Sequence, residues 1–488
     1  MASCLHKKPI FTKHDQYYSR TFFDQQGVET RIKNYFLLFS ENDNFHQKIK
    51  LSRNLHKKYL LNSLKGLSES NQALDASIPW LIYWTLHSLD ILGVLDSEEF
   101  AKEFIQKGFI KKAISTLSWC QSKEGGFGGG HLQLPHLAPT YAATNALAIL
   151  SRFDPTAISV IDRKTMKEFL LKMKNKDGSF NLHENGESDT RGAYCALSTA
   201  HLLQIDDQDV TKNTGGWIAT CQTYEGGFSA RPWREAHGGY TFCAIAALSI
   251  LGELDKIEME PLIDWLVHKQ MRFSGGFQGR INKLVDGCYS FWQGGVFSFF
   301  KDYLNEQTNQ DIFKIYQIGQ QQKNENEEKN EILKKEEGEK KEKEKEKEEK
   351  EIIGEEKEEE EKEEEEEEEE NEEEEEEEEN EPLDWLEGNY GSVNLLFDEI
   401  SLQGYILACC QDTRGGLMDK PLKGRDLYHT CYCLSGLSCS QNNLSKEKNP
   451  VVLGLEENLV NKIDPIHNIT ELASNSVKKY FETLNNKN

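Results

Sequence analysis

Three residues of the types that hold metal ions are the most informative feature of this sequence. Asp286 and Cys288 stand two residues apart in the segment Asp-Gly-Cys, and His429 follows far downstream, directly after Tyr428. A carboxylate, a thiolate and an imidazole are all good zinc ligands, and catalytic zinc sites commonly use three protein ligands and leave a fourth position open. If the three side chains converge, the sequence predicts a reactive zinc centre.

Each of these residues also has a structural interpretation. Cys288 by itself is typical of a small buried apolar residue, and His429 by itself could be a hydrogen-bonded histidine of the core. Lone cations are most often solvated surface charges, and aromatic residues at helical spacing most often pack a core. The metal hypothesis therefore depends on whether such residues gather at equivalent positions of the fold.

The charge of the chain is concentrated in one segment. Between Lys323 and Glu381 there are 36 Glu and 12 Lys, which account for almost all of the formal net charge of −26 over 488 residues. The rest of the chain is nearly neutral, so the sequence predicts no nucleic-acid partner. A Glu/Lys tract of this kind cannot bury a core, and we expect a solvated insertion at 316–383.

The cysteines and the hydropathy pattern bear on the compartment. The 11 cysteines stand mostly inside apolar helical patterns, and no signal-peptide pattern opens the chain at Met1–Ile10, which argues against a secreted disulfide framework. No apolar run is long enough to span a bilayer. We expect a cytoplasmic protein with reduced thiols and no membrane span.

A short motif recurs along the chain and marks an internal repeat. Gln121, Lys174, Gln222 and Gln270 stand near the start of successive copies at spacings of 53, 48 and 48 residues, and the next copy follows the acidic insertion. Repeats of this length indicate stacked supersecondary units. The copies are Trp119–Phe127, Lys174–Phe180, Cys221–Phe228, Lys269–Phe277 and Cys410–Leu417.

Each repeat reads as a helix, a polar loop with a glycine pair, and a second helix, since glycine suits a helix C-terminus. First helices are predicted at Lys111–Gln121, Thr211–Gln222, Pro261–Gln270 and Leu396–Gln411. Strand alternation is scarce, so the fold class is all-α. Six second helices favour a closed α/α toroid (an α6–α6 barrel) of helical hairpins over an open solenoid. These second helices are expected to begin near Pro79, Pro139, Arg191, His237, Cys288 and His429.

The domain boundaries follow from the repeat and the insertion. We expect a partly helical N-terminal extension (1–70), the first part of the toroid (71–315) and the charged insertion (316–383). The last repeat with the zinc histidine (384–445) and a C-terminal segment (446–488) complete the chain.

The residues able to do chemistry lie at the starts of the second helices. If these helices run parallel around a ring, the residues meet at one mouth. Helix N-termini bind anions, so the cations Arg191, His237, Arg280 and Lys283 predict a diphosphate site. A substrate with a diphosphate head and a long hydrocarbon tail would suit this site and an adjoining apolar cavity. The aromatic residues expected to line that cavity are Trp80, Trp84, Tyr194, Tyr240, Trp292 and Tyr432.

Three long segments carry a family resemblance. Glu235–Cys243, Gly279–Gln293 and Arg425–Gly436 strongly resemble the β subunits of protein farnesyltransferases. The resemblance covers roughly 75–300 and 395–440, and it departs at the Glu-rich insertion and at both termini.

The resemblance implies a heterodimer with an α subunit, which supplies a further lysine to the diphosphate. It implies transfer of farnesyl from farnesyl diphosphate to the cysteine of a C-terminal Cys-aliphatic-aliphatic-X (CaaX) box. Zinc, one per heterodimer, would be held by Asp286, Cys288 and His429. A catalytic role is also implied for Tyr289, Lys283 and Arg280. Further lipid contacts would come from Arg191, Tyr194, His237, Gly239, Tyr240, Cys243 and Trp292, and peptide contacts from Trp80, Trp84 and Tyr428.

The choice between a C15 and a C20 lipid rests on two features. Trp80 and Tyr432 occupy positions that resemble the farnesyl-selective pocket floor, where a large ring leaves no room for another isoprene unit. Asp419 matches a position linked to magnesium assistance in farnesyltransferases, where geranylgeranyl enzymes have lysine. Both features favour C15, with a type I geranylgeranyltransferase β subunit as the alternative.

Two other classes remain less favoured. A terpene cyclase of the squalene type needs an Asp-x-Asp-Asp motif, and the sequence has none. An inactive scaffold would be expected to lose a zinc ligand or a diphosphate cation, and all are present.

Overall fold

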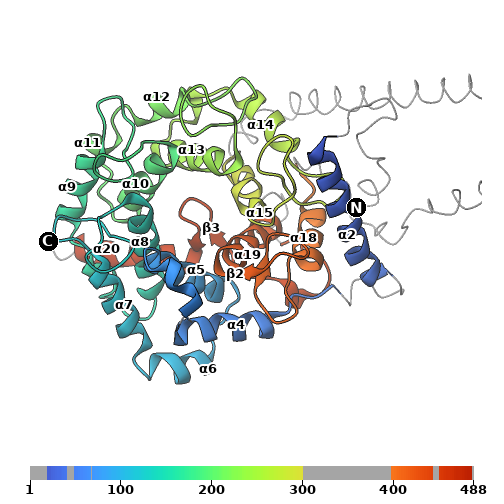
Figure 1. Cartoon of the computed structure of the whole chain (residues 1–488). Helices are drawn as coiled ribbons and strands as arrows, with labels where there is room; N and C mark the ends of the chain where they lie inside the picture. The colour runs from blue at the N-terminus through green and yellow to red at the C-terminus, as the bar shows by residue number, and fades with distance from the viewer. Residues whose placement is uncertain (1–18, 41–48, 67–68, 301–396, 443–449, 486–488) are drawn as a thin grey trace, which may run out of the picture. The chain divides into compact units, whose positions relative to one another are not determined.

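The structure, a computed structural model, describes residues 19–40, 49–66, 69–300, 397–442 and 450–485 (Figure 1). The predicted charged insertion (316–383) lies outside the described residues. Helices dominate these ranges. The strands in them form two antiparallel pairs, and each strand has two residues. The pairs are β1 (Leu417–Met418) with β2 (Arg425–Asp426), and β3 (Ile463–Asp464) with β4 (Ile469–Thr470). The predicted all-α class is confirmed.

Six helices form an inner ring (Figure 1). Each packs against the next along the chain, and the last packs against the first, which closes the ring. The predicted α/α toroid is therefore confirmed. The inner helices are α5 (Ile78–Ile91), α8 (Leu137–Leu150), α10 (Thr190–Leu202), α13 (Gly238–Leu251), α15 (Tyr289–Trp292) and α19 (Leu427–Asn442).

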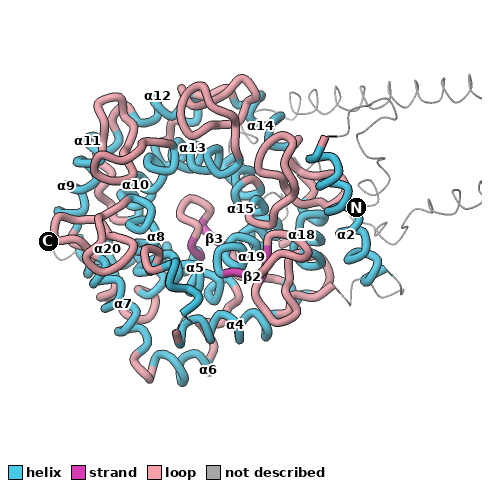
Figure 2. Tube along the Cα trace, viewed as in Figure 1, coloured by secondary structure: helices cyan, strands magenta, loops and turns pink. Residues whose placement is uncertain are grey.

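An outer set of helices surrounds this ring, as the tube in Figure 2 also shows. The outer helix α9 is amphipathic: it buries Met166, Phe169, Leu170 and Met173, spaced by three, one and three residues on one face. The set comprises α4 (Arg53–Lys65), α7 (Phe109–Cys120), α9 (Arg163–Met173), α11 (Gln208–Thr211), α12 (Thr214–Ala219), α14 (Met259–Val267) and α18 (Glu399–Cys409).

The remaining elements are short connections and two terminal helices. The helix α2 (Arg20–Ser40) packs against α18, and α20 (Glu471–Asn485) packs against α8. The short turns are η1 (Glu69–Leu74), α6 (Glu98–Phe100), η2 (Ala101–Ile105), η3 (Ile158–Val160), η4 (Leu254–Lys256), η5 (Gly294–Phe300) and η7 (Glu456–Asn458).

The glycine loops join each repeat to the next outer helix. Gly226 has a left-handed φ of +98°, and a Cβ there would lie 2.0 Å from the carbonyl oxygen of Pro261 in α14. Gly415 has φ +86°, and its Cβ would lie 2.1 Å from the carbonyl oxygen of Leu55 in α4. Only glycine fits such a position. The same contact therefore closes the outer ring onto α4, a helix within the predicted N-terminal extension (1–70).

Two helices differ from the sequence-based expectation. The continuous first helix expected over Thr211–Gln222 is wrong, because Asn213 adopts a left-handed φ of +65° and helix resumes only over Thr214–Ala219. The second helix expected near Cys288 begins there but covers only Tyr289–Trp292 before a 3-10 segment. Gly294 and Gly295 explain this early end, because glycine is a weak helix former.

The described helices contain no segment with both the length and the apolar character needed to cross a bilayer. Ten cysteines fall in the described ranges, and all are buried.

Candidate active site

The inner helices present their N-termini at one end of the ring. For five of these six helices, the amide that opens the helix, or one in the turn before it, donates to a carbonyl in the loop of the next repeat. Thr190 donates to Ala230 (3.1 Å), Gly238 to Gly279 (2.8 Å), and Gly287 to Asp419 (2.8 Å). Because the same bond recurs around the ring, the helices run in the same direction. The expected gathering of residues at one mouth follows from this register.

The three predicted metal ligands converge at this end. The ligand atoms of Asp286, Cys288 and His429 all lie within 4.8 Å of one another. Nε2 of His429 lies 3.3 Å from Oδ1 of Asp286. A tetrahedral zinc ion with bonds of about 2.0–2.3 Å holds its ligand atoms about 3–4 Å apart, so small side-chain adjustments would complete the set.

The turn that carries Asp286 and Cys288 is held from several sides. Oδ1 of Asp286 accepts a hydrogen bond from the amide of Cys288 (2.8 Å), which fixes the carboxylate over its own turn. A Cβ on Gly287 would lie 2.6 Å from Sγ of Cys433 and 3.0 Å from Sγ of Cys410. The glycine between the two ligands therefore lets the turn pack directly onto α18 and α19.

His429 is oriented by a residue that the sequence analysis did not identify. Nδ1 of His429 lies 2.6 Å from a carboxylate oxygen of Asp426, and the amide of His429 donates to the other oxygen (2.7 Å). Metal-bound histidines usually give their second ring nitrogen to such a carboxylate. This arrangement leaves Nε2 directed at Asp286. The signal in the sequence was the acid three residues before the histidine.

The electrostatics of the cluster suit a cation. Burial raises the pKa of the Cys288 thiol well above its usual range, and Asp286 raises it further. Burial acts to lower the pKa of His429, but Asp286 and Asp426 outweigh burial and raise it above its usual range. A divalent ion among these groups would favour the thiolate and the neutral imidazole. The chemistry of the donor set, the spacing and the Asp426 partner therefore fit zinc.

Asp419, the predicted magnesium residue, lies beside this cluster. Its carboxylate pairs with Lys420, and burial followed by the nearby Asp286 raises its pKa. Its carbonyl oxygen accepts from the Gly287 amide and from the hydroxyl of Tyr405 (2.9 Å). The backbone of Asp419 thus supports the turn that carries Asp286 and Cys288. Its side chain is half-buried near the predicted zinc ligands.

The residues predicted to bind the diphosphate lie next to the turn that carries Asp286 and Cys288. Tyr289 follows Cys288, and its hydroxyl lies 2.9 Å from Nε2 of His237. His237 caps α13, because its Nδ1 accepts from the amide of Gly239 (3.1 Å). A Cβ on Gly279 would lie 2.1 Å from Cζ of Tyr289, so the Gly279 loop and Tyr289 are tightly packed. The fourteen-residue helix α13 therefore begins directly beside His237 and Tyr289.

The cations of this cluster are arranged around it. Arg191 pairs with Asp189 and lies over the ring of Tyr240, with 5.6 Å between the guanidinium carbon and the ring centroid. Arg280 pairs with Glu235, and Lys283 is exposed. Two of the three basic side chains are thus held by carboxylates, and an incoming phosphate would compete for them.

The aromatic residues form a closed belt inside the ring. Adjacent members have ring centroids 4.4–5.8 Å apart, and each of the six inner helices contributes at least one. Such a belt gives the interior an apolar, well-packed wall. In order of contact, its members are Trp80, Tyr141, Tyr194, Phe242, Trp292, Tyr432, Tyr428 and Trp84.

Tyr141 and Phe242 in this belt were missed by the sequence analysis. Their position in the repeat, directly followed by a small residue, is the same as that of Tyr194. Cys243, a predicted lipid contact, directly follows Phe242 and is buried on α13.

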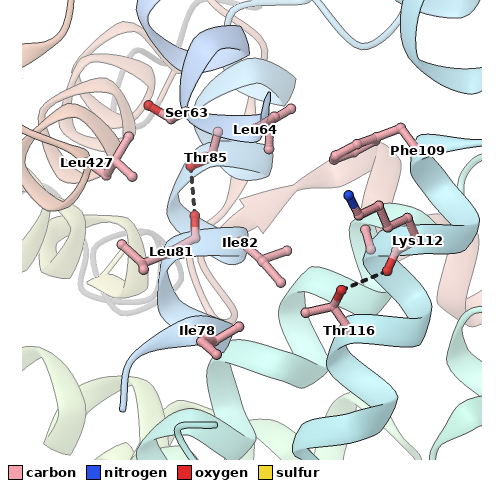
Figure 3. Close-up of a pocket in the computed structure, with 11 residues that line it drawn as sticks. Ser63, Leu64, Ile78, Leu81, Ile82, Thr85, Phe109, Lys112, Thr116 and Leu427 are labelled. Atoms are coloured by element: carbon pink, nitrogen blue, oxygen red, sulfur yellow. Dashed lines mark hydrogen bonds between the residues drawn. The ribbon is translucent and has the colours of Figure 1, made fainter. Parts of the chain in front are cut away.

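Two cavities lie between inner and outer helices. One of about 820 Å³ lies next to Trp84 and Tyr428, the predicted peptide contacts, and includes Lys58, Arg425 and Asp426 in its wall. The other, of about 190 Å³, lies between α4, α5 and α7 (Figure 3). Its lining is largely aliphatic, as Ile78, Leu81 and Ile82 illustrate, and it contains none of the predicted site residues.

Comparisons with known proteins agree with this architecture. Residues 51–469 match the family model of the prenyltransferase alpha-alpha toroid domain. The chain is 38% identical over 465 residues to a protein farnesyltransferase subunit beta of Arabidopsis thaliana, covering 94% of this chain and 89% of that protein. It is 30% identical over 272 residues to a geranylgeranyl transferase type-1 subunit beta of the same plant, covering 49% of this chain and 70% of that protein.

A solved structure shares the fold. It is the Candida albicans protein geranylgeranyltransferase-I complexed with GGPP, at a TM-score of 0.58 and 22% identity, covering 88% of this chain and 99% of the solved chain. At this identity, the likeness concerns the fold alone.

Proposed function

The chain belongs to the protein farnesyltransferase β-subunit family of prenyltransferase α/α toroids, and from this premise we propose that it is the catalytic subunit of a heterodimeric, zinc-dependent protein farnesyltransferase. The observation that carries the proposal is the convergence of Asp286, Cys288 and His429 within 4.8 Å beside the cationic cluster. The longer match to a farnesyltransferase subunit than to a geranylgeranyl transferase subunit favours the C15 lipid.

The reaction joins two substrates at this end of the ring. The sulfur of an acceptor cysteine in a CaaX box forms a bond to carbon 1 of farnesyl diphosphate. The bond from carbon 1 to the diphosphate oxygen breaks, diphosphate leaves, and the thiol proton passes to solvent. When bound, zinc lowers the pKa of a thiol that coordinates it, so that the thiolate is available at neutral pH.

The residues around the cluster have separate roles in this proposal. Asp286, Cys288 and His429 hold the metal, and Asp426 keeps His429 in place. Arg280, Lys283, His237 and Tyr289 face the leaving diphosphate, where fixed cations and donors stabilise the developing charge.

The wall of the ring receives the hydrocarbon chain, and the neighbouring side chains receive the peptide. Tyr194, Tyr240, Trp292 and Tyr432 would contact the lipid, and Trp80, Trp84 and Tyr428 the aliphatic residues of the CaaX box. Trp84 and Tyr428 line the cavity of about 820 Å³, and this position supports their assignment to the peptide.

Two features of the proposal concern partners and conditions. An α subunit completes the enzyme, and Asp419 assists with magnesium at the diphosphate. The cytoplasm is the proposed location.

Co-expression with a cognate α subunit tests the function. We expect transfer of labelled C15, and much less C20, from the lipid diphosphate to a CaaX peptide, with a higher rate in magnesium. A peptide with serine in place of the acceptor cysteine is the control. Preferential transfer of C20 would replace the proposal with a type I geranylgeranyltransferase subunit, and transfer of neither lipid would overturn it.

A further inference from the structure

The C-terminal segment that follows the last repeat contains a turn with no role assigned so far. Residues 464–469 run from the end of β3 through a turn to the start of β4, and Figure 1 shows β3 and this loop inside the ring of helices. Hydrogen bonds between this turn and three inner helices also place it inside the ring.

The backbone of the turn accepts hydrogen bonds from the aromatic wall. The hydroxyl of Tyr141 donates to the carbonyl of His467 (2.7 Å), and the hydroxyl of Tyr194 donates to the carbonyl of Ile466 (2.8 Å). The hydroxyl of Tyr83 donates to the carbonyl of Asn468 (2.5 Å). Three successive carbonyls thus hold three tyrosines from α5, α8 and α10.

These tyrosines are the support of the predicted lipid pocket. The ring of Trp80 lies 5.8 Å from that of Tyr141 and 6.0 Å from that of Tyr83, between centroids. Tyr194 in turn lies 5.3 Å from Tyr141. Since all three tyrosines are at most 3% exposed, water cannot replace a lost hydroxyl partner. The bonds to the turn therefore fix where the wall of the pocket stands.

The turn is itself held in one conformation. A side-chain oxygen of Asp464 accepts from the amide of Ile466 (3.0 Å), and the carbonyl of Asp464 accepts from the amide of Asn468 (2.9 Å). Nδ1 of His467 lies 2.9 Å from the hydroxyl of Ser198. Asn468 has a left-handed φ of +54°, a conformation that asparagine tolerates.

We propose that residues 464–469 form a positioning element that holds the Tyr83, Tyr141 and Tyr194 wall and thereby sets the length of lipid the ring accepts. Asp464 is a positioning residue in this scheme, because it acts through the turn and contacts no ring of the belt. The inference rests on the proposed function for the identity of the lipid. The physical reason is that a tyrosine whose hydroxyl is held by a hydrogen bond cannot move aside to admit the additional five-carbon unit of a C20 lipid.

The test measures binding of two lipids to the heterodimer. Affinities for farnesyl and geranylgeranyl diphosphate are compared for the wild-type protein, Tyr141→Phe and Asp464→Ala. Tyr141→Phe keeps the ring and removes the bond, while Asp464→Ala loosens the turn from a partly exposed position. A buried hydrogen bond of ordinary strength corresponds to about a two- to tenfold change, so we expect the preference for C15 to fall by that factor in both variants.

Ser151→Ala is the matched control. Ser151 lies just past the end of α8 and its hydroxyl contacts Ser476 of α20 (3.1 Å), so it links the inner ring to the C-terminal segment without touching the turn. We expect its C15 preference to equal that of wild type. Unchanged preference in both test variants overturns the inference, and so does an equal loss in Ser151→Ala. Thermal unfolding of each variant checks that the preference, and not merely the folded fraction, has changed.

Direct binding keeps this inference separate from the proposed function. Failure of the wild-type heterodimer to transfer either lipid to a peptide would remove the enzyme assignment. The ratio of the two lipid affinities would still decide whether the turn sets the length of the pocket.

Discussion

Nδ1 of His429 lies 2.6 Å from a carboxylate oxygen of Asp426, three residues earlier on the same strand-to-helix junction. This contact determines which ring nitrogen of His429 is free to bind a metal. It joins the end of β2 to the first turn of α19, so a two-residue strand has a direct part in the proposed metal centre.

Removing this carboxylate should weaken the metal site. In Asp426→Asn the partner of Nδ1 loses its charge, and we expect zinc affinity to fall about 10- to 100-fold, the usual effect of such partners. Competition with a chromogenic chelator measures the change. Asp162→Asn serves as control, because Asp162 caps the outer helix α9. Equal zinc affinity in Asp426→Asn and wild type would show that Asp426 does not orient the ligand.

The thiol of Cys288 should be required for the metal. Cys288→Ala leaves two ligands, and we expect less than a tenth of the wild-type zinc content after dialysis, since a catalytic site has only three protein ligands to lose. Metal analysis of the purified heterodimer gives the result. Cys439→Ala, a buried cysteine near the other end of α19, should keep its zinc. Wild-type content in Cys288→Ala would exclude Cys288 as a ligand.

The indole of Trp80 should limit the length of the lipid. Trp80→Thr removes a ring that contacts Trp84 (5.4 Å) and Tyr141 (5.8 Å), and the space gained favours the longer chain. We expect the ratio of kcat/KM for C15 over C20 to fall by at least about tenfold, which corresponds to burial of one or two CH₂ groups. Trp119→Thr is the control, because Trp119 is 65% exposed on α7. An unchanged ratio in Trp80→Thr would refute its place in the pocket floor.

Buried histidines should make the fold sensitive to mild acid. Burial lowers the pKa of His467 to about 4 from an ordinary value of 6.5. Between pH 6.5 and 4, His467 binds a proton in the unfolded chain but stays neutral in the folded protein. The free energy of unfolding therefore falls between pH 6.5 and 4, by an amount on the order of 3 kcal/mol for this group, and does not change on its account above pH 6.5.

The melting temperature measured from pH 8 to pH 4 tests this sign. His467→Gln replaces the titrating ring with a neutral amide, so its melting temperature should fall less steeply than that of wild type below pH 6.5. His268→Gln is the control, because His268 lies on the outer surface near the end of α14. Parallel pH profiles for His467→Gln and wild type would contradict a buried neutral His467.

Much of the architecture was readable in the sequence. The recurring glycine loops predicted helical hairpins because a left-handed residue at a helix end is cheapest as glycine. The starts of the second helices were placed within a few residues. The expected helix over Thr211–Gln222 was wrong because one left-handed residue, Asn213, interrupts it, and helix propensity does not encode such a local conformation.

The sequence by itself determined the repeat, the residue types of the metal cluster and the side on which they gather, because a periodic fold places equivalent positions together. The tertiary structure alone decided how the ring closes and what supports its interior. Tyr141 donates to the carbonyl of His467 across 326 residues, and Tyr194 donates to the carbonyl of Ile466 across 272. Such bonds join unique segments through backbone carbonyls and amides, which every residue carries, so they leave no pattern in the sequence.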